Sequence, residues 1–279
     1  MTASLSITSS NAGAVAPAWR VVGRAWRCDI DLASERTLPE EIPVAFSYHG
    51  TTHAVLMATP DNLEDFAFGF SRTEGIIRTV AEVSDLTVVR GDDGIELRMW
   101  LASGTSDAFA ARRRRFVGPS GCGMCGLESL AEANRSLPVV ASHAKINRRQ
   151  IKEAVAALPR SQALHAVTRA VHAAAFWKPS SGLSLIREDV GRHNAIDKLA
   201  GAMLQQGHSA ADGVIVLSSR ISIELVQKAC MIGAPVLIAV SAPTAYAVRA
   251  AEQAGITLVG VARADGFEVF THFDRITSD

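Results

Sequence analysis

The runs Val214-Ile215-Val216-Leu217 and Val236-Leu237-Ile238-Ala239-Val240 decide the fold class, because every position in them is apolar. Strands covered on both faces have this composition, whereas half-exposed strands alternate between apolar and polar residues. Helical patterns occupy residues 194–206, 222–232 and 244–254, so helices and strands alternate here. We therefore predict an α/β domain with a mostly parallel sheet sandwiched between helices.

This pattern extends outward over residues 138–279, which we predict to be one C-terminal α/β domain. Further strands are expected at residues 163–177, 183–187, 257–262 and 268–272. Residues 20–137 predict a smaller α+β domain that ends in a cysteine-containing loop. Its expected elements are strands at 42–48, 52–57, 85–89 and 95–101, and a helix that begins at Pro60 with Thr59 as N-cap. Residues 1–19 predict a disordered tail.

Composition narrows the function classes. The chain has 279 residues, 48% of them hydrophobic, and a formal net charge of zero. This balance argues against nucleic acid or a membrane surface as a partner. No apolar run approaches the ~20 residues of a membrane span, and the uncharged tail lacks the basic start of a secretory signal. Four cysteines in a chain of this length do not form a disulfide framework, which favours the cytoplasm.

The segment Cys122-Gly123-Met124-Cys125 is the first candidate for chemistry. Its spacing suits half of a zinc site, thioredoxin-like exchange, or a cysteine that carries sulfur as a persulfide; an inert loop is the fourth reading. A persulfide carrier needs a thiolate on a flexible mount. The arginines at 112–115 and a helix start after Cys125 favour a thiolate, and the surrounding glycines give mobility. We therefore favour the sulfur carrier.

A second candidate lies in residues 187–198, where a predicted strand ends and a helix begins. Asp189 or Asn194 would cap this helix in the simplest interpretation. In the functional interpretation, Arg192 offers a planar donor fork to a phosphate at the helix start, with His193 beside it.

Residues that offer hydroxyls, arginines or backbone N–H groups also follow the ends of three predicted strands, where ligands bind in open α/β sheets. They are Ser218, Ser219 and Arg220 after the first strand, Ser241 after the second, and Val261, Ala262, Arg263, Ala264, Asp265 and Gly266 after the third. Together they predict a pocket of nucleotide size. His172, on a predicted strand, fits either a hydrogen-bonded core residue or a member of this pocket.

Several literal strings resemble the FdhD family of formate dehydrogenase accessory sulfurtransferases. The most specific are Ser120-Gly121-Cys122-Gly123-Met124-Cys125-Gly126, Glu188-Asp189-Val190-Gly191-Arg192-His193-Asn194-Ala195-Ile196-Asp197-Lys198, and Ser218-Ser219-Arg220 with Glu224 and Lys228. Shorter matches include Met57-Ala58-Thr59-Pro60 and Gly69-Phe70. The chain departs from the family where Arg169 and Ser219 stand at positions at which glycine is common.

The resemblance implies a sulfur relay. A cysteine desulfurase would load a persulfide on Cys122, with Cys125 secondary, and the sulfur would pass to the molybdenum bis-guanine-dinucleotide cofactor for formate dehydrogenase. This cofactor would be the bound substrate, held by the strand-end residues with Arg192, His193 and His172, and no permanently bound metal is expected. The resemblance also implies a C-terminal domain like that of cytidine deaminases and a homodimer. The alternative is a zinc- or nucleotide-binding accessory protein without sulfur-transfer chemistry.

Overall fold

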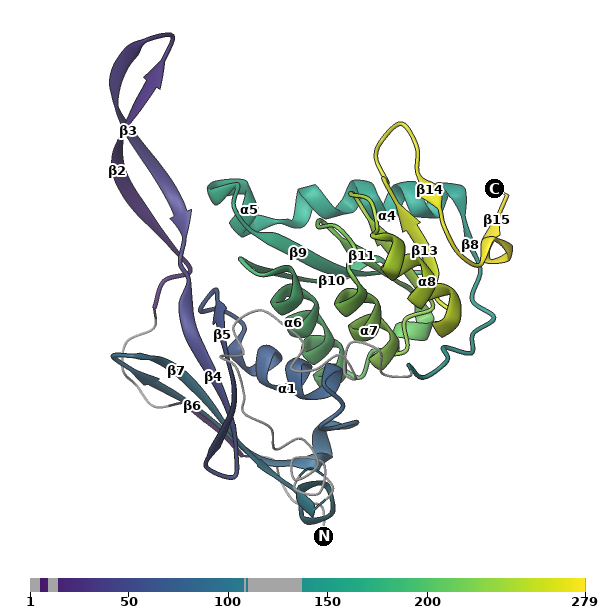
Figure 1. Ribbon diagram of the computed structural model, residues 1–279, viewed down its shortest axis with the longest axis horizontal. Helices are drawn as coiled ribbons and strands as arrows, with labels where there is room; N and C mark the ends of the chain where they lie inside the picture. The colour runs from purple at the N-terminus through teal and green to yellow at the C-terminus, as the bar shows by residue number, and fades with distance from the viewer. Residues whose placement is uncertain (1–5, 10–14, 108, 110–136, 279) are drawn as a thin grey trace.

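The computed structural model describes residues 6–9, 15–107, 109 and 137–278. Two sheets flank a central set of helices in Figure 1. Cys122 and Cys125, the arginines at 112–115 and the predicted mobile loop lie outside the described residues. The boundary expected between residues 137 and 138 stays a prediction.

The first sheet has five strands in the order β1-β6-β7-β4-β5. Their bounds are β1 Ser6–Ser9, β4 Ile42–Tyr48, β5 Thr51–Ala58, β6 Val83–Gly91 and β7 Gly94–Leu101, with a short 3-10 helix η1 at Val80–Glu82. The helix α1, Leu63–Thr73, covers one face and buries Phe66 and Phe70 against Phe46. Strand β1 pairs with β6, so the tail expected over residues 1–19 is wrong for Ser6–Ser9.

The start of α1 differs from the prediction. The helix begins at Leu63 after Asn62, not at Pro60, and Thr59 does not cap it. Thr59 is fully buried, and its backbone and hydroxyl bond to residues of the second sheet region. A tertiary contact thus overrides the local capping signal.

The second sheet has six strands in the order β10-β9-β11-β12-β13-β14. The strands are β9 His172–Lys178, β10 Gly182–Asp189, β11 Val214–Leu217, β12 Val236–Ala239, β13 Thr257–Gly260 and β14 Glu268–Val269. Helices α6 Arg192–Gln205, α7 Ile223–Met231 and α8 Ala245–Ala254 lie on one side, and α4 Arg148–Ser161 lies on the other. The region also contains α5 Ala163–Thr168, a small sheet of β8 Ile146–Asn147 and β15 Ile276–Thr277, and the 3-10 helices η2 Ala210–Asp212 and η3 Phe273–Arg275.

Both faces of this sheet are covered, which explains the continuous apolar runs. Ile215 and Leu217 join the core under α6, α7 and α8, whereas Val214 and Val216 join the core under α4. The C-terminal region is therefore a three-layer α/β/α domain, accompanied by the smaller α+β region.

Two details of the predicted sheet are wrong. Only the pairs β11–β12 and β12–β13 are parallel, and β9 pairs antiparallel with both β10 and β11, so the sheet is mixed. The tight connection from Lys178 to Gly182 forces β9 and β10 into a hairpin. In addition, the strand expected at 163–177 begins at His172, because α5 occupies Ala163–Thr168.

Helices α1 and α6 join the two regions by a backbone-to-backbone contact. A Cβ atom added to Gly69 would lie 1.6 Å from the Asp197 carbonyl oxygen, and one added to Gly201 would lie 1.8 Å from the Asp65 carbonyl oxygen. Only glycine fits at these two positions, so the glycines set the distance between the helices.

A two-stranded hairpin that the sequence interpretation missed extends away from the body in Figure 1. It consists of β2 Ala18–Arg27 and β3 Ile30–Pro39, and it also begins within the expected tail. Cys28 and Asp29 form its two-residue turn, both with positive φ.

Candidate functional site

The topology brings the predicted ligand residues to one edge of the second sheet. The parallel strands β11, β12 and β13 end there, so Ser218, Ser241 and Val261 follow one another across the edge. Because β9 and β10 run antiparallel to their neighbours as a hairpin, His172 opens β9 beside Asp189 at the same edge. We call the set His172, Arg192, His193, Ser218–Arg220, Ser241 and residues 261–266 the polar edge.

His193 contacts the start of the neighbouring helix α7. Its Nε2 lies 3.4 Å from the Ser222 hydroxyl and 3.5 Å from a Glu224 carboxylate oxygen, and Ser222 donates to that carboxylate. Burial, followed by the positive charge of Arg192, lowers the pKa of His193 to about 4, although Glu224 opposes this shift. His193 is therefore a neutral imidazole at pH 7, able to donate one hydrogen bond and accept another.

Arg192 carries a buried nitrogen that has no partner among the described residues. Its Nε is shielded from solvent and makes no hydrogen bond to any described residue. Arg192 is the first residue of α6, and the N-cap residue is Gly191, which has no side chain to cap the helix. The simplest interpretation, in which Asp189 or Asn194 caps this helix, is therefore wrong. Burial and then the charge of Arg192 lower the pKa of His172. A guanidinium N–H at a helix start is a donor suited to an anion.

The serines after β11 have structural contacts of their own. The Ser218 hydroxyl accepts a hydrogen bond from the Ala173 N–H, which continues the β9–β11 pairing by one position. Ser219 is buried and donates to the Arg220 carbonyl, whereas Arg220 is exposed. Ser219 is not among the residues with positive φ, so its backbone does not require glycine.

The loop after β13 closes on itself. Arg263 and Gly266 exchange backbone hydrogen bonds of 2.8 Å and 3.3 Å, and residues 263–265 are exposed. Val261, at the start, has φ +49°, which is a strained conformation for a β-branched residue. Its N–H donates to the Ser241 carbonyl, and this hydrogen bond links the second and third strand ends.

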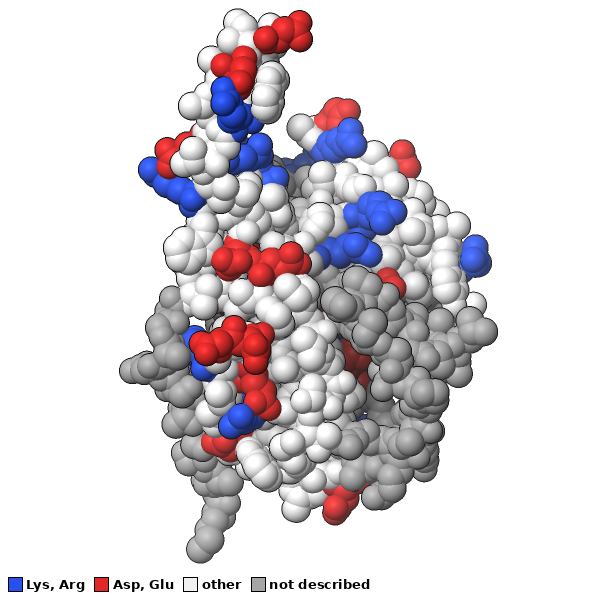
Figure 2. Space-filling model, turned by 60° about the vertical axis from the view of Figure 1, so that its left-hand side comes forward, with Lys and Arg blue, Asp and Glu red and all other residues white. Residues whose placement is uncertain are grey.

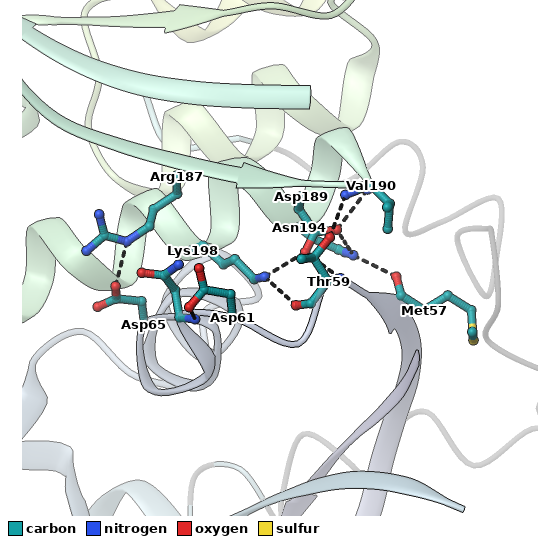
Figure 3. A network of polar contacts seen from close by, with 11 residues as sticks. Met57, Thr59, Asp61, Asp65, Arg187, Asp189, Val190, Asn194 and Lys198 are labelled. Atoms are coloured by element: carbon teal, nitrogen blue, oxygen red, sulfur yellow. Dashed lines mark hydrogen bonds and ion pairs between the residues drawn. The ribbon is translucent and has the colours of Figure 1, made fainter. Parts of the chain in front are cut away.

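The charged string at 188–198 divides into surface and interior residues, a division that spacing alone could not show. Asp189, Asn194, Asp197 and Lys198 are buried, whereas Arg192 and His193 reach the polar edge. Figure 3 shows Lys198 between the Asp189 carboxylate at 2.7 Å and the Thr59 carbonyl at 2.8 Å.

Asn194 extends this network to the first sheet. Its side-chain amide donates to the Met57 carbonyl at 2.8 Å and to Asp189 at 2.9 Å, while Asp189 accepts from the Thr59 N–H. Sequence reasoning missed the role of Met57 and Thr59. The available signal was the string Met57-Ala58-Thr59-Pro60. It is one of the shorter matches to the family, but its residue types do not by themselves indicate a role.

A second buried cluster lies between α1, α6 and α7. Lys228 contacts Asp197 at 2.9 Å and Glu74 at 3.1 Å, and Thr73 donates to Asp197 at 2.6 Å. Burial alone would lower the pKa of Lys228, but Asp197 and Glu74 raise it. Burial raises the pKa of Asp197 to about 6, against the opposing effect of Lys228. These residues therefore tie the two regions together.

The two residues before Asp189 complete the frame. Glu188 accepts the Leu164 and His165 N–H groups, each at 2.8 Å, and so places a negative charge at the start of α5. Arg187 pairs with Asp65 of α1 at 2.6 Å. Arg169, at the end of α5, has φ +58°, which explains why glycine suits this position.

Neither a metal cluster nor a membrane-spanning helix occurs in the part of the chain that the structure describes. Among the described residues, no group of three or more His, Cys, Asp or Glu side chains is placed to hold a metal ion. No helix within the described ranges combines the length and apolar character required to cross a bilayer.

The model of the FdhD/NarQ family matches residues 39–277, which include the second sheet, every strand of the first sheet except β1, and the polar edge. The chain belongs to the FdhD/NarQ family. It is 50% identical over 258 residues to the "Sulfur carrier protein FdhD" of Agrobacterium fabrum, covering 92% of this chain and 95% of that one. It is 45% identical over 251 residues to the protein of the same name from Cupriavidus necator, covering 90% and 87%.

A solved structure agrees with the fold of this FdhD/NarQ protein. The crystal structure of a protein assigned as a formate dehydrogenase accessory protein from Desulfotalea psychrophila superposes with a TM-score of 0.73 at 22% identity. The superposition covers 94% of this chain and 100% of that chain. The likeness therefore extends to both regions of the fold.

Proposed function

We propose that this FdhD/NarQ protein is a sulfur carrier in the cytoplasm. It takes persulfide sulfur from a cysteine desulfurase on Cys122, with Cys125 secondary, and transfers that sulfur to the molybdenum bis-guanine-dinucleotide cofactor as its substrate. The sulfurated cofactor then serves formate dehydrogenase. We further propose that the carrier works as a homodimer. Family membership and the names of the relatives support this proposal.

The observation that carries the proposal is the buried Arg192 Nε without a described partner. A buried guanidinium N–H that lacks an acceptor costs free energy, and a ligand phosphate oxygen would supply that acceptor. Each guanine dinucleotide contributes a pyrophosphate. Arg192 therefore fits the chemistry of the proposed substrate. The proposed phosphate contact needs only this guanidinium group and no metal ion.

Neighbouring residues of the polar edge would orient the rest of the ligand. His193 is neutral at pH 7 because burial lowers its pKa to about 4, so it offers a hydrogen bond without another positive charge. Arg220 and Arg263 are exposed on two of the loops beside it. We propose that these arginines face the phosphates, while the other residues of the loop 261–266 contact the base and ribose.

The carrier step is tested with the two cysteines. Purified protein is incubated with a cysteine desulfurase and cysteine, and the added sulfur is located by mass spectrometry. Cys122→Ala should lose the persulfide and abolish formate dehydrogenase maturation, and Cys125→Ala should retain part of both. Normal maturation with Cys122→Ala would overturn this assignment. Stoichiometric zinc without persulfide would instead support the metal-binding alternative.

The ligand step is tested separately with GDP. Arg192→Ala should weaken GDP binding by roughly 10- to 100-fold, the loss of a charge-assisted hydrogen bond. Arg160→Ala is the matched control, because Arg160 is an exposed arginine on α4. Unchanged GDP binding by Arg192→Ala, or crosslinking of GDP only to residues 39–107, would contradict the proposed site.

A further inference from the structure

His193 and the start of α7 form a three-residue contact that the proposed function does not explain. Ser222 is the N-cap residue of α7, and a serine there ordinarily accepts a backbone N–H of the first turn, yet its side chain makes no cap hydrogen bond. The Ser222 hydroxyl instead donates to a Glu224 carboxylate oxygen at 2.5 Å. These two oxygens lie 3.4 Å and 3.5 Å from the His193 Nε2. The capping role is thus replaced by a contact with the imidazole.

This contact determines which imidazole nitrogen carries the proton. Burial alone would raise the pKa of Glu224, but the hydrogen bonds from Ser222 and from its own backbone N–H bring it below the ordinary value. Glu224 is therefore ionised at pH 7 and can only accept, and Ser222, whose proton goes to Glu224, can only accept from His193. Nε2 faces two acceptors, so the neutral imidazole carries its one proton there.

The other nitrogen, Nδ1, is then an acceptor. It has no hydrogen-bond partner among the described residues, and the His193 side chain is 35% exposed, so a ligand can reach it. Burial and then the charge of Arg192 lower the pKa of His193, so the two side chains lie close together. A nitrogen lone pair repels a phosphate oxygen, whereas the Arg192 guanidinium attracts it. Arg192 therefore selects an anion, and His193 selects an O–H or N–H donor.

We propose that His193 Nδ1 accepts a hydrogen bond from a ribose hydroxyl of the nucleotide, and that Ser222 and Glu224 are positioning residues that hold the required tautomer. The ribose adjoins the phosphates of a nucleotide, as His193 adjoins Arg192. The chain has no net charge, and acidic and basic side chains are interspersed on the face in Figure 2, so bulk charge gives little selectivity. The inference rests on the proposed function, because Arg192 binds the phosphate there.

Nitrogen NMR of the isotope-labelled, ligand-free full chain tests the tautomer. At pH 7 the His193 of the unsubstituted chain should carry its proton on Nε2. Glu224→Gln should shift part of the population to the Nδ1–H tautomer, because a side-chain amide can donate to Nε2. Glu153→Gln, on the exposed side of α4, is the matched control. A proton on Nδ1 in the unsubstituted chain, or an unaltered tautomer in Glu224→Gln, would overturn the positioning role.

Binding of GDP and of dideoxy-GDP, which lacks both ribose hydroxyls, tests the ligand contact. The unsubstituted chain should bind dideoxy-GDP roughly 3- to 10-fold more weakly, the loss of one neutral hydrogen bond. His193→Gln keeps a donor toward Ser222 and Glu224 but has no atom at the Nδ1 position, so it should bind both nucleotides equally. His143→Gln, at an exposed loop position, is the matched control and should discriminate as the unsubstituted chain does.

Three outcomes would overturn the ribose contact. They are equal binding of both nucleotides by the unsubstituted chain, undiminished discrimination by His193→Gln, and weaker binding of IDP in place of dideoxy-GDP, which would put the donor on the base. If Arg192→Ala still weakens GDP binding in these cases, the proposed phosphate site stands and only this contact fails. The tautomer is measured without nucleotide or sulfur transfer, so a failed persulfide assay leaves it unaffected.

Discussion

Gly69 of α1 and Gly201 of α6 pack back to back. A Cβ atom on Gly69 would lie 2.7 Å from the Gly201 nitrogen, and one on Gly201 would lie 2.8 Å from the Gly69 nitrogen. Two helices from the two regions of the chain thus touch through their main chains. The close approach lets the side chains around the glycines, including Lys198 and Asp65, reach partners in the opposite region.

Replacing either glycine should force the helices apart. Gly201→Ala should lower the free energy of unfolding by about 3 kcal/mol or more, because the added methyl group meets backbone that cannot yield. Chemical denaturation gives the value. Gly104→Ala, where nothing lies within 4 Å of the added Cβ, is the control and should change stability little. An unaltered unfolding midpoint for Gly201→Ala would show that the helices are less tightly packed.

The buried pair of Lys198 and Asp189 should be sensitive to the loss of one member. Both side chains have 0% exposure, so Lys198→Met leaves a buried carboxylate without its cation. The expected loss of stability is about 3–5 kcal/mol, and adding Asp189→Asn should recover part of it. Denaturation curves of the single and double variants measure this coupling. Lys145→Met, which breaks the exposed pair with Asp274, should have a small effect.

Arg169→Gly should stabilise the protein. Arg169 ends α5 with φ +58°, a conformation that glycine adopts without steric cost. A gain of about 0.5–1 kcal/mol is expected. Arg160→Gly is the opposite control, because Arg160 lies within α4, where glycine has a lower helix propensity than arginine. Thermal melts of both variants should therefore shift in opposite directions.

Stability should depend on the protonation of His193. Its pKa is about 4 in the folded protein and 6.5 ordinarily, so the unfolded chain binds the proton more readily. The contribution of His193 is therefore fully present above pH 6.5 and is lost progressively as the pH falls toward 4. Denaturation of His193→Gln across this window should show a weaker pH dependence than the unsubstituted protein.

Titration by NMR identifies the neighbour that tunes this imidazole. Glu224→Gln should lower the pKa of His193 further, since Glu224 raises it. Glu252→Gln, placed beside His272 at 4.0 Å, should leave His193 unchanged. A His193 that titrates at or above its ordinary value would contradict the burial at the polar edge.

The sequence predicts best those elements whose side chains are buried on every face. Strands β11 and β12 were predictable because both faces are covered, which removes any polar alternation. The hairpin of β2 and β3 was missed because its turn uses Cys28 and Asp29 at positive φ instead of the glycine or asparagine that usually signals a hairpin.

The candidate site was predictable only in part, for a related reason. The alternation of strands and helices is enough to place Ser218, Ser241 and Val261 at a common edge of the sheet. In contrast, the sequence at 188–198 alone suggests a single site. Only the tertiary contacts show that Lys198 is fully buried, whereas His193 lies at the polar edge. The partners that bury Lys198 come from Thr59 and Asp189, 130 residues apart in the sequence.

The glycine contact between α1 and α6 also constrains how this chain can diverge. A larger residue at Gly69 can survive only if the surface around Gly201 changes with it, so the two positions should covary among relatives. The same holds for Thr59 and Asp189, which bond across the same boundary. A chimera that joins the first region of one homologue to the second region of a distant one would inherit mismatched helix faces. We therefore expect the two regions to evolve together, although each contains its own sheet.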